Sequence, residues 1–363
     1  MHRRRGETDG NLWKEDHLMK RTSPAVKALK SVAIALALPV IMYVIMELLV
    51  FATQGKHLFN SVLDIRNLIR GAGISAAVAF ALSMNLTSGR MDLSLGAQRV
   101  AGTILGGLLA QNLGLTGVWY LLFAIVFGIL FGALVGTAFV TMRVPPMVLG
   151  IGMACILECV GFATSGGIGL RIVGVPGTEI LSDATFTIIV IAVMVVFMLF
   201  LMTYTRFSYN FRAVRGSQQI ARNSGINVFI NVAICYTVAG ALVCVSGILD
   251  SAFSGSMNAS MGLTSNGSVM ANMFAMMIGC TFLARYINQA VGVLSAAVAL
   301  RIFAMGLTAF NVSDAVSSCI NMALFIAFLV WQANSNVLKQ RRYDRARIAQ
   351  AQELKRQRAA AAA

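Results

Sequence analysis

Charge, and acidic charge above all, is scarce in this chain. Of its 363 residues 12% are charged, Asp and Glu number 14 against 29 Lys and Arg, and only three residues are His. Soluble globular domains carry about 25% charged residues, so this composition excludes an ordinary soluble fold. Hydrophobic residues reach 58%, which is more apolar surface than one core can bury. The sequence therefore predicts a polytopic membrane protein.

Motifs for catalysis are missing as well. The sequence contains no GxxxxGK[ST] phosphate loop, no GxSxG elbow and no HExxH pair, which excludes common nucleotide-binding and hydrolase sites. All six cysteines fall in apolar segments and the three histidines fall outside them, so we expect packed thiols rather than a metal site. We predict no catalytic residue, no metal, no cofactor and no capacity to hydrolyse ATP.

Long apolar runs are what the chain does have. A hydrocarbon core of about 30 Å needs roughly 20 apolar residues per helix, and the runs predict an all-α fold of about ten transmembrane helices, with a range of eight to ten. The second and eighth spans are the weakest. The predicted spans lie near residues 31–52, 71–88, 94–111, 118–141, 147–165, 185–204, 228–251, 268–283, 290–310 and 315–333. Residues 60–70 predict a short amphipathic helix at the membrane interface.

Basic residues set the expected orientation. Residues 1–30 carry eight Lys and Arg, the tail from Lys339 carries eight, and the segment 205–227 carries four with no acid. By the positive-inside rule these segments face the cytoplasm, so both termini are expected there. We predict a basic cytoplasmic segment 1–30, a transmembrane domain 31–333 with a cytoplasmic loop 205–227, and a basic tail 334–363. Such tails attract anionic lipid, and no nucleic-acid partner is expected.

The segment 87–96, TSGRMDLSLG, interrupts the membrane pattern. Asp92 stands where an N-cap would open the third span, and backbone donors left unsatisfied in a membrane are costly. One interpretation is a structural cap, alone or paired with Arg90 or Arg99. The other is that this broken element lines or gates a transport pathway. The two interpretations are compatible.

Two motifs carry a resemblance to a known family. MDLSLG resembles the G-I-D-L-S-V-G motif in the membrane permeases of ribose-type and branched-chain-amino-acid-type ABC importers, and RGSQQIARNSGINV resembles the cytoplasmic loop of the same permeases. The likeness covers roughly residues 58–333 and is closer to the sugar-permease branch. The matched positions are Asp92, Leu93, Ser94 and Gly96 in the first motif, and Gly216, Arg222, Ser224, Gly225, Ile226 and Val228 in the second.

The resemblance implies a permease subunit in the bacterial plasma (inner) membrane that moves a small polar solute, a sugar or a related compound. It implies ABC ATPase subunits on the cytoplasmic side, an extracytoplasmic solute-binding protein, and a second permease copy or paralogue as partners. The chain departs from the family's pattern at Arg90, where a second glycine is usual, at Gln218, where an acid is common, and at Ile220, where alanine is frequent.

The loop 205–227 is expected to couple the membrane domain to the ATPase. Gly216 and Gly225 are predicted to reverse the chain and Ser217 to cap a short helix, with Ile220 and Ile226 as anchors. The alternative is an ordinary solvated loop whose arginines anchor it at the membrane. The predicted coupling residues are Arg212, Arg215, Gly216, Ala221, Arg222, Ser224, Gly225 and Ile226.

The solute is the least determined part of the prediction. Polar residues near the broken elements are candidates to contact it, although most such residues bond to a neighbouring helix instead. These candidates are Ser83, Asn85, Gln98, Asn272 and Thr281. A different class of function, an ion-coupled secondary transporter, would use Glu47, Asp92 or Glu158 to carry protons.

Overall fold

A computed structural model of the chain describes residues 24–86, 89–142, 144–313 and 315–335, with isolated positions 340, 344 and 347. Most of the predicted segment 1–30 and of the predicted tail 334–363 lies outside these residues. Helices dominate the described part, together with one pair of two-residue antiparallel strands, β1 (Leu170–Arg171) and β2 (Ser256–Met257). The fold class predicted from composition is confirmed.

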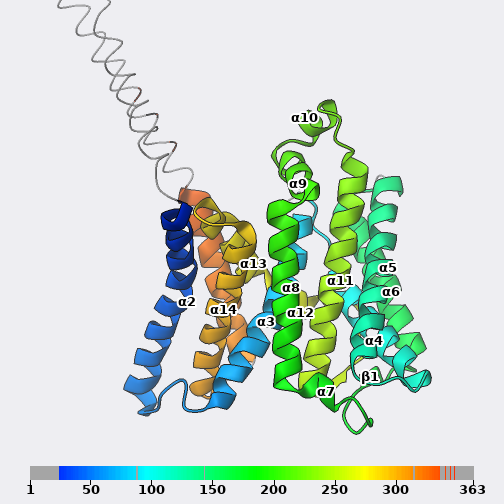
Figure 1. Ribbon diagram of the computed structural model, residues 1–363, viewed down its shortest axis with the longest axis horizontal. Helices are drawn as coiled ribbons and strands as arrows, with labels where there is room; N and C mark the ends of the chain where they lie inside the picture. Colours follow the sequence, from blue (N-terminus) through cyan, green and yellow to red (C-terminus); the bar gives the residue numbers. More distant parts are fainter. Residues whose placement is uncertain are drawn as a thin grey trace, which may run out of the picture. The chain divides into compact units, whose positions relative to one another are not determined.

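The elements of the main unit follow the predicted spans closely (Figure 1). In chain order they are α2 (Pro24–Gln54), α3 (Val62–Leu86), α4 (Leu95–Asn112), α5 (Val118–Met142), α6 (Pro146–Thr164), α7 (Glu179–Ser182), α8 (Ala184–Tyr204), α9 (Arg206–Gly216), α10 (Gln218–Asn223), α11 (Val228–Ser254), α12 (Asn266–Met270), α13 (Met273–Met277), the π-helix η2 (Ile278–Phe282), the 3₁₀-helix η3 (Leu283–Arg285) and α14 (Gln289–Ala309).

Nine helical segments of the described chain are long and apolar enough to cross a membrane. The predicted third span is a further helix, α4, whose 18 residues include Gln98, Arg99 and Thr103, all of them buried. These polar side chains are tolerated because α4 packs against α5, α6 and α11 and is enclosed by protein. The nine segments and α4 together match the predicted range of eight to ten.

The chain from Asn311 onward forms a separate compact unit. Within it, residues 315–335 form an apolar helix of 21 residues with a mean hydropathy of 1.7. This helix corresponds to the tenth predicted span, 315–333.

The start of α3 corrects the predicted interface helix. Residues 62–70 are the first turns of a continuous helix that runs to Leu86. Ser61 and Asp64 form a capping box in which the Asp64 carboxylate accepts the backbone N–H groups of Asn60 at 3.0 Å and Ser61 at 2.9 Å. The exposed apolar side chains of this turn, Val62, Leu63 and Ile65, suit contact with lipid.

The eighth predicted span, 268–283, is broken into short pieces. Its chain passes through α12, α13, a π-helical turn at η2 and a 3₁₀ turn at η3 before α14 begins at Gln289. Irregular backbone of this kind survives at membrane depth only where protein encloses it. Val269, Ala275 and Met276 in this segment are accordingly almost completely buried.

Helix α11 lies at the centre of the main unit and packs against α3, α4 and α5. The contact with α5 is close because glycines recur every fourth residue of α5, at Gly128, Gly132 and Gly136. A methyl group added at Gly132 would lie 2.3 Å from the backbone oxygen of Tyr236 on α11. The two backbones are therefore closer than any larger residue allows.

The prediction of packed thiols is correct for three of the six cysteines. Cys235, Cys244 and Cys280 are buried, whereas Cys155, Cys159 and Cys319 are exposed. The sequence placed all six in apolar helices, but only the contacts between helices decide which face each thiol occupies.

The main unit has two distinct ends (Figure 1). Helices α9 and α10 extend beyond the helices at the top of the view, and α7 and β1 lie at the bottom. We refer to these as the α10 end and the α7 end.

We predict that Gly132→Ala lowers the thermal stability of the purified chain in detergent. The added methyl group must push α5 away from the backbone of α11, at a cost of about 1–3 kcal/mol. Gly152→Ala on α6 is the matched control, because nothing lies within 4 Å of a methyl group there, and alanine favours a helix by up to about 1 kcal/mol over glycine. Equal melting temperatures for the two variants would contradict this account of the α5–α11 contact.

Candidate functional site

The loop that precedes α4 is organised around Asp92, which is 4% exposed. Its Oδ1 accepts the backbone N–H of Ser94 at 2.8 Å and the Ser94 hydroxyl at 2.6 Å. Its Oδ2 accepts from the Asn85 amide at 3.2 Å and, at 3.5 Å, from the Gln98 amide, which also donates to the Ser94 hydroxyl at 2.8 Å. The carboxylate thus ties the end of α3 to the start of α4.

This geometry corrects two details of the prediction. Asp92 satisfies the start of α4, but the N-cap position itself is Ser94. Neither arginine pairs with Asp92: Arg99 forms an ion pair with Asp250 at 2.5 Å and donates to the Ser246 hydroxyl at 3.1 Å. Arg90 lies over the ring of Phe139, with 5.6 Å between its Cζ and the ring centroid.

The other matched positions of the first motif serve close packing. A methyl group at Gly96 would lie 2.6 Å from the backbone oxygen of Ser265, just before α12. The backbone nitrogen of Leu93 lies 2.9 Å from the methyl position of Gly150 on α6. Small residues at these positions let the loop, α6 and the broken α12 segment meet.

A second buried carboxylate supports that broken segment. Glu158 on α6 is 2% exposed and accepts the backbone N–H groups of Leu263 at 2.8 Å and Ser265 at 3.1 Å. Leu263 has a positive φ of 66°, a strained conformation that these contacts help to hold. Glu47, the third proposed proton carrier, contacts the His57 ring at 2.6 Å and the backbone N–H of Leu58 at 2.9 Å. All three carboxylates therefore hold local structure.

The five candidate solute contacts do not form one site. Asn85 and Gln98 converge on Asp92, beside a cavity of only about 10 Å³, which is too small to hold a solute. Each of the remaining three donates to a backbone carbonyl three or four residues earlier in the chain. Ser83 donates to Phe80, Asn272 to Ser268 and Thr281 to Met277.

The predicted coupling loop 205–227 contains two helices, α9 and α10, where one short helix was expected. The Thr205 hydroxyl caps α9 through the N–H of Ser208, and the Ser217 hydroxyl caps α10 through the N–H of Ile220, as predicted for Ser217. Asn227 caps α11 through the N–H of Ile230. Three caps within 23 residues give this segment a defined path from α8 to α11.

One of the two predicted chain reversals is correct. Gly225 has φ of +80°, and Ile226 donates to the Ala221 carbonyl at 3.1 Å, which ends α10 as glycine commonly does. Gly216 is the last helical residue of α9, and the chain turns instead at the extended Ser217. The hydroxyl of Ser224 donates to the carbonyl of Ile220 at 2.9 Å.

Arginines tie α9 to the helices below it. Arg212 donates to the Met202 carbonyl at 2.8 Å, at the end of α8, and Arg215 donates to Gln289 at the start of α14 at 3.0 Å. Phe211 and Val214 are buried beneath α9. In α10 only Ala221 is buried, whereas Ile220 is 68% exposed. The Ile220 side chain therefore packs against no core of the main unit, and its predicted role as an anchor of the coupling element stays a prediction.

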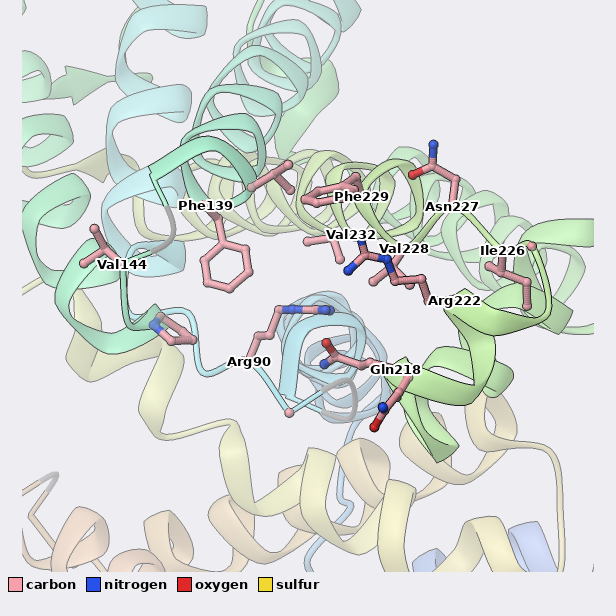
Figure 2. A pocket seen from close by; sticks show the side chains of 15 residues that line it. Arg90, Phe139, Val144, Gln218, Arg222, Ile226, Asn227, Val228, Phe229 and Val232 are labelled. Carbon is pink, nitrogen blue, oxygen red and sulfur yellow. The ribbon is translucent and has the colours of Figure 1, made fainter.

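The second motif and the two residues just before the first motif line one cavity of about 880 Å³ at the α10 end. Gly89 and Arg90 precede the first motif, and Gln218 and Arg222 belong to the second. Figure 2 shows the guanidinium groups of Arg90 and Arg222 turned into this space, with Phe139 beside Arg90. Residues more than 100 positions apart thus form one recess with two arginines on largely apolar walls, which neither segment alone could indicate.

We predict different outcomes for two substitutions of Asp92. Asp92→Asn keeps an oxygen for Ser94 but turns an amide toward the donors of Asn85 and Gln98, so a loss of about 1 kcal/mol is expected. Asp92→Leu leaves several buried donors unsatisfied and should cost about 3 kcal/mol or more.

The measurement is the melting temperature and the yield of monodisperse protein. Glu179→Gln, at an exposed acid on α7, is the control and should match the original chain. Asp92→Leu protein as stable as this control would show that the carboxylate does not hold the loop.

Comparisons with known proteins agree with this arrangement. The family model described as "Branched-chain amino acid transport system / permease component" matches residues 64–329. A solved structure described as an inward-facing conformation of a metal-chelate type ABC transporter is similar in fold, with a TM-score of 0.53 and 12% identity, over 82% of this chain and 99% of that one. No curated protein matches the sequence. Since the family model covers most of its length, the chain belongs to the branched-chain amino acid transport permease family, the membrane subunits of ABC transporters.

Proposed function

We propose that this chain is the membrane-spanning subunit of an ABC importer in the bacterial inner membrane. It translocates a small polar solute, a sugar or a related compound, using ATP hydrolysed by a partner subunit. The observation that carries the proposal is the α9–α10 segment, which extends from one end of the main unit and presents arginines and the exposed Ile220. On this capped, basic element the exposed Ile220 offers an apolar contact to a soluble partner.

The α9–α10 segment is connected to three long helices, so a movement of the segment would be transmitted to them. Its arginines reach α8 through Met202 and α14 through Gln289, and its last residues lead directly into α11. A partner that displaces α9 and α10 would therefore act on three long helices at once. We propose that ATP-driven motion of the partner enters the membrane domain by this route.

The same segment argues for the orientation of the chain. Four arginines and no acid lie in residues 205–227, which favours the cytoplasmic side for the α10 end. The α7 end would then face outward and meet a solute-binding protein. Apolar side chains such as Leu36, Val196 and Phe200 cover the outside of α2 and α8, where lipid or a second permease copy would pack.

We expect Ile220→Asp to abolish association with the partner ATPase, because it places a charge at the centre of the proposed docking surface. Copurification of the ATPase subunit with the chain should fall by more than tenfold. Ile180→Asp is the matched control, since Ile180 is 52% exposed on α7 at the opposite end. If Ile180→Asp were as damaging, or Ile220→Asp harmless, α10 would not be the docking element.

A second expected outcome concerns nucleotide. The isolated chain should neither bind nor hydrolyse ATP, because its sequence has no phosphate-cradling loop. Equilibrium dialysis with labelled ATP, before and after addition of the ATPase subunit, measures this directly. Stoichiometric binding by the isolated chain would refute the division of labour proposed here.

A further inference from the structure

A second, smaller cavity of about 120 Å³ lies toward the α7 end, between α3, α11 and α14. Its lining is polar and includes Arg70, Ser75, Asp250 and Arg301. Arg70 donates to the Ser182 carbonyl at the end of α7 at 2.9 Å, which fixes the cavity near that end. None of the motifs that define the family lies here.

The Arg301 side chain is held in place by packing, with its Nε left unbonded. It projects from α14 across α3 at Gly71, where an added methyl group would lie 2.1 Å from the Arg301 Nε. That Nε is buried, and among the described residues it has no hydrogen-bond acceptor. A half-buried guanidinium left in this state is costly, so its retention indicates that something else supplies the acceptor.

The neighbouring charges do not meet this need. Arg70 lies over the ring of Phe253, with 5.3 Å between its Cζ and the ring centroid, and it forms no ion pair among the described residues. Asp250, the acid of the cavity, is already bound by Arg99 at 2.5 Å. Three guanidinium groups therefore surround one engaged carboxylate, and the cavity carries an excess of positive charge.

We propose that this cavity binds a carboxylate or phosphate group, with Arg301 and Arg70 as its ligands and Ser75 beside them. Planar guanidinium groups bind such anions through paired hydrogen bonds. A volume of about 120 Å³ holds about four water molecules, which suits one anionic group and excludes a whole sugar. The site thus receives the charged end of a larger molecule.

The origin of that anion rests on the proposed function. If the α7 end faces outward, the site lies on the entry side of the transporter, and the anionic group belongs to the solute, such as an acidic or phosphorylated sugar. An anionic lipid headgroup offers the same chemistry. The binding assay below needs no ATPase, so its failure would leave the docking result for Ile220 unaffected, and the reverse also holds.

The test uses the full chain in nanodiscs of phosphatidylcholine. Its melting temperature is measured against potassium phosphate and against potassium acetate, with chloride keeping the ionic strength constant. We expect a saturable rise with at least one of the two anions. Arg301→Gln should weaken the apparent affinity by at least tenfold, and Gly71→Ala should do the same by displacing the guanidinium.

The matched control is Arg66→Gln, which removes one positive charge as Arg301→Gln does. Arg66 is exposed on α3, one turn before Arg70, and lies outside the cavity. It should leave the response unchanged, and Arg301→Lys should give an intermediate affinity if Arg301→Gln folds poorly. A response that is absent, or equal in Arg301→Gln and Arg66→Gln, would overturn the proposal. Phosphatidylglycerol in the nanodisc is the test for lipid. If it raises the melting temperature, removes the further effect of phosphate, and has no effect on Arg301→Gln, the anion site is supported and its ligand is a lipid headgroup.

Discussion

Every break in a helix inside a membrane exposes backbone N–H groups that hydrocarbon cannot satisfy, and this constraint organises the centre of the protein. Two buried carboxylates meet it. Asp92 takes the N–H of Ser94 before α4, and Glu158 takes those of Leu263 and Ser265 before α12. With both breaks satisfied, the segmented eighth span can pack inside the protein, with α12 against α4 and α13 against α3 and α14.

Glycines allow the segments around these breaks and the neighbouring helices to pack closely. Gly96 admits the backbone of Ser265, and Gly132 admits that of Tyr236. These contacts bring α12 onto α4 and α11 onto α5. The recess lined by Arg90 and Arg222 at the α10 end lies beside the second of these contacts, because its walls include Phe139 of α5 and Val232 of α11.

The sequence was sufficient for the helices and for the family. Hydropathy located the long spans, and the motif around Asp92 together with the loop from Gly216 to Val228 indicated the permease class that the family model confirms. Capping by Ser217 and the reversal at Gly225 followed from local residue chemistry. These features depend on near neighbours in the chain, which a sequence shows directly.

Features that depend on distant neighbours could not be read in the same way. Arg99 pairs with Asp250, 151 positions away, and the sequence offered Asp92 instead. The exposure of Cys155 depends on which face of α6 meets protein, and a uniformly apolar helix gives no sign of this. The predicted roles of the coupling residues and of the solute contacts remain predictions.

Helix α14 joins two regions that have so far been treated separately. Its first residue, Gln289, is bonded to Arg215 of α9, and Arg301 lies twelve residues further along, about 18 Å at 1.5 Å per residue. A helix of this length is stiff, and Gly292 lies close against the π-helical turn that precedes it. Any tilt or slide imposed on α14 at Arg215 must therefore reposition the Arg301 guanidinium relative to Arg70. Under the two proposals made above, ATP hydrolysis by the partner subunit and anion binding at Arg301 would be linked through this one helix.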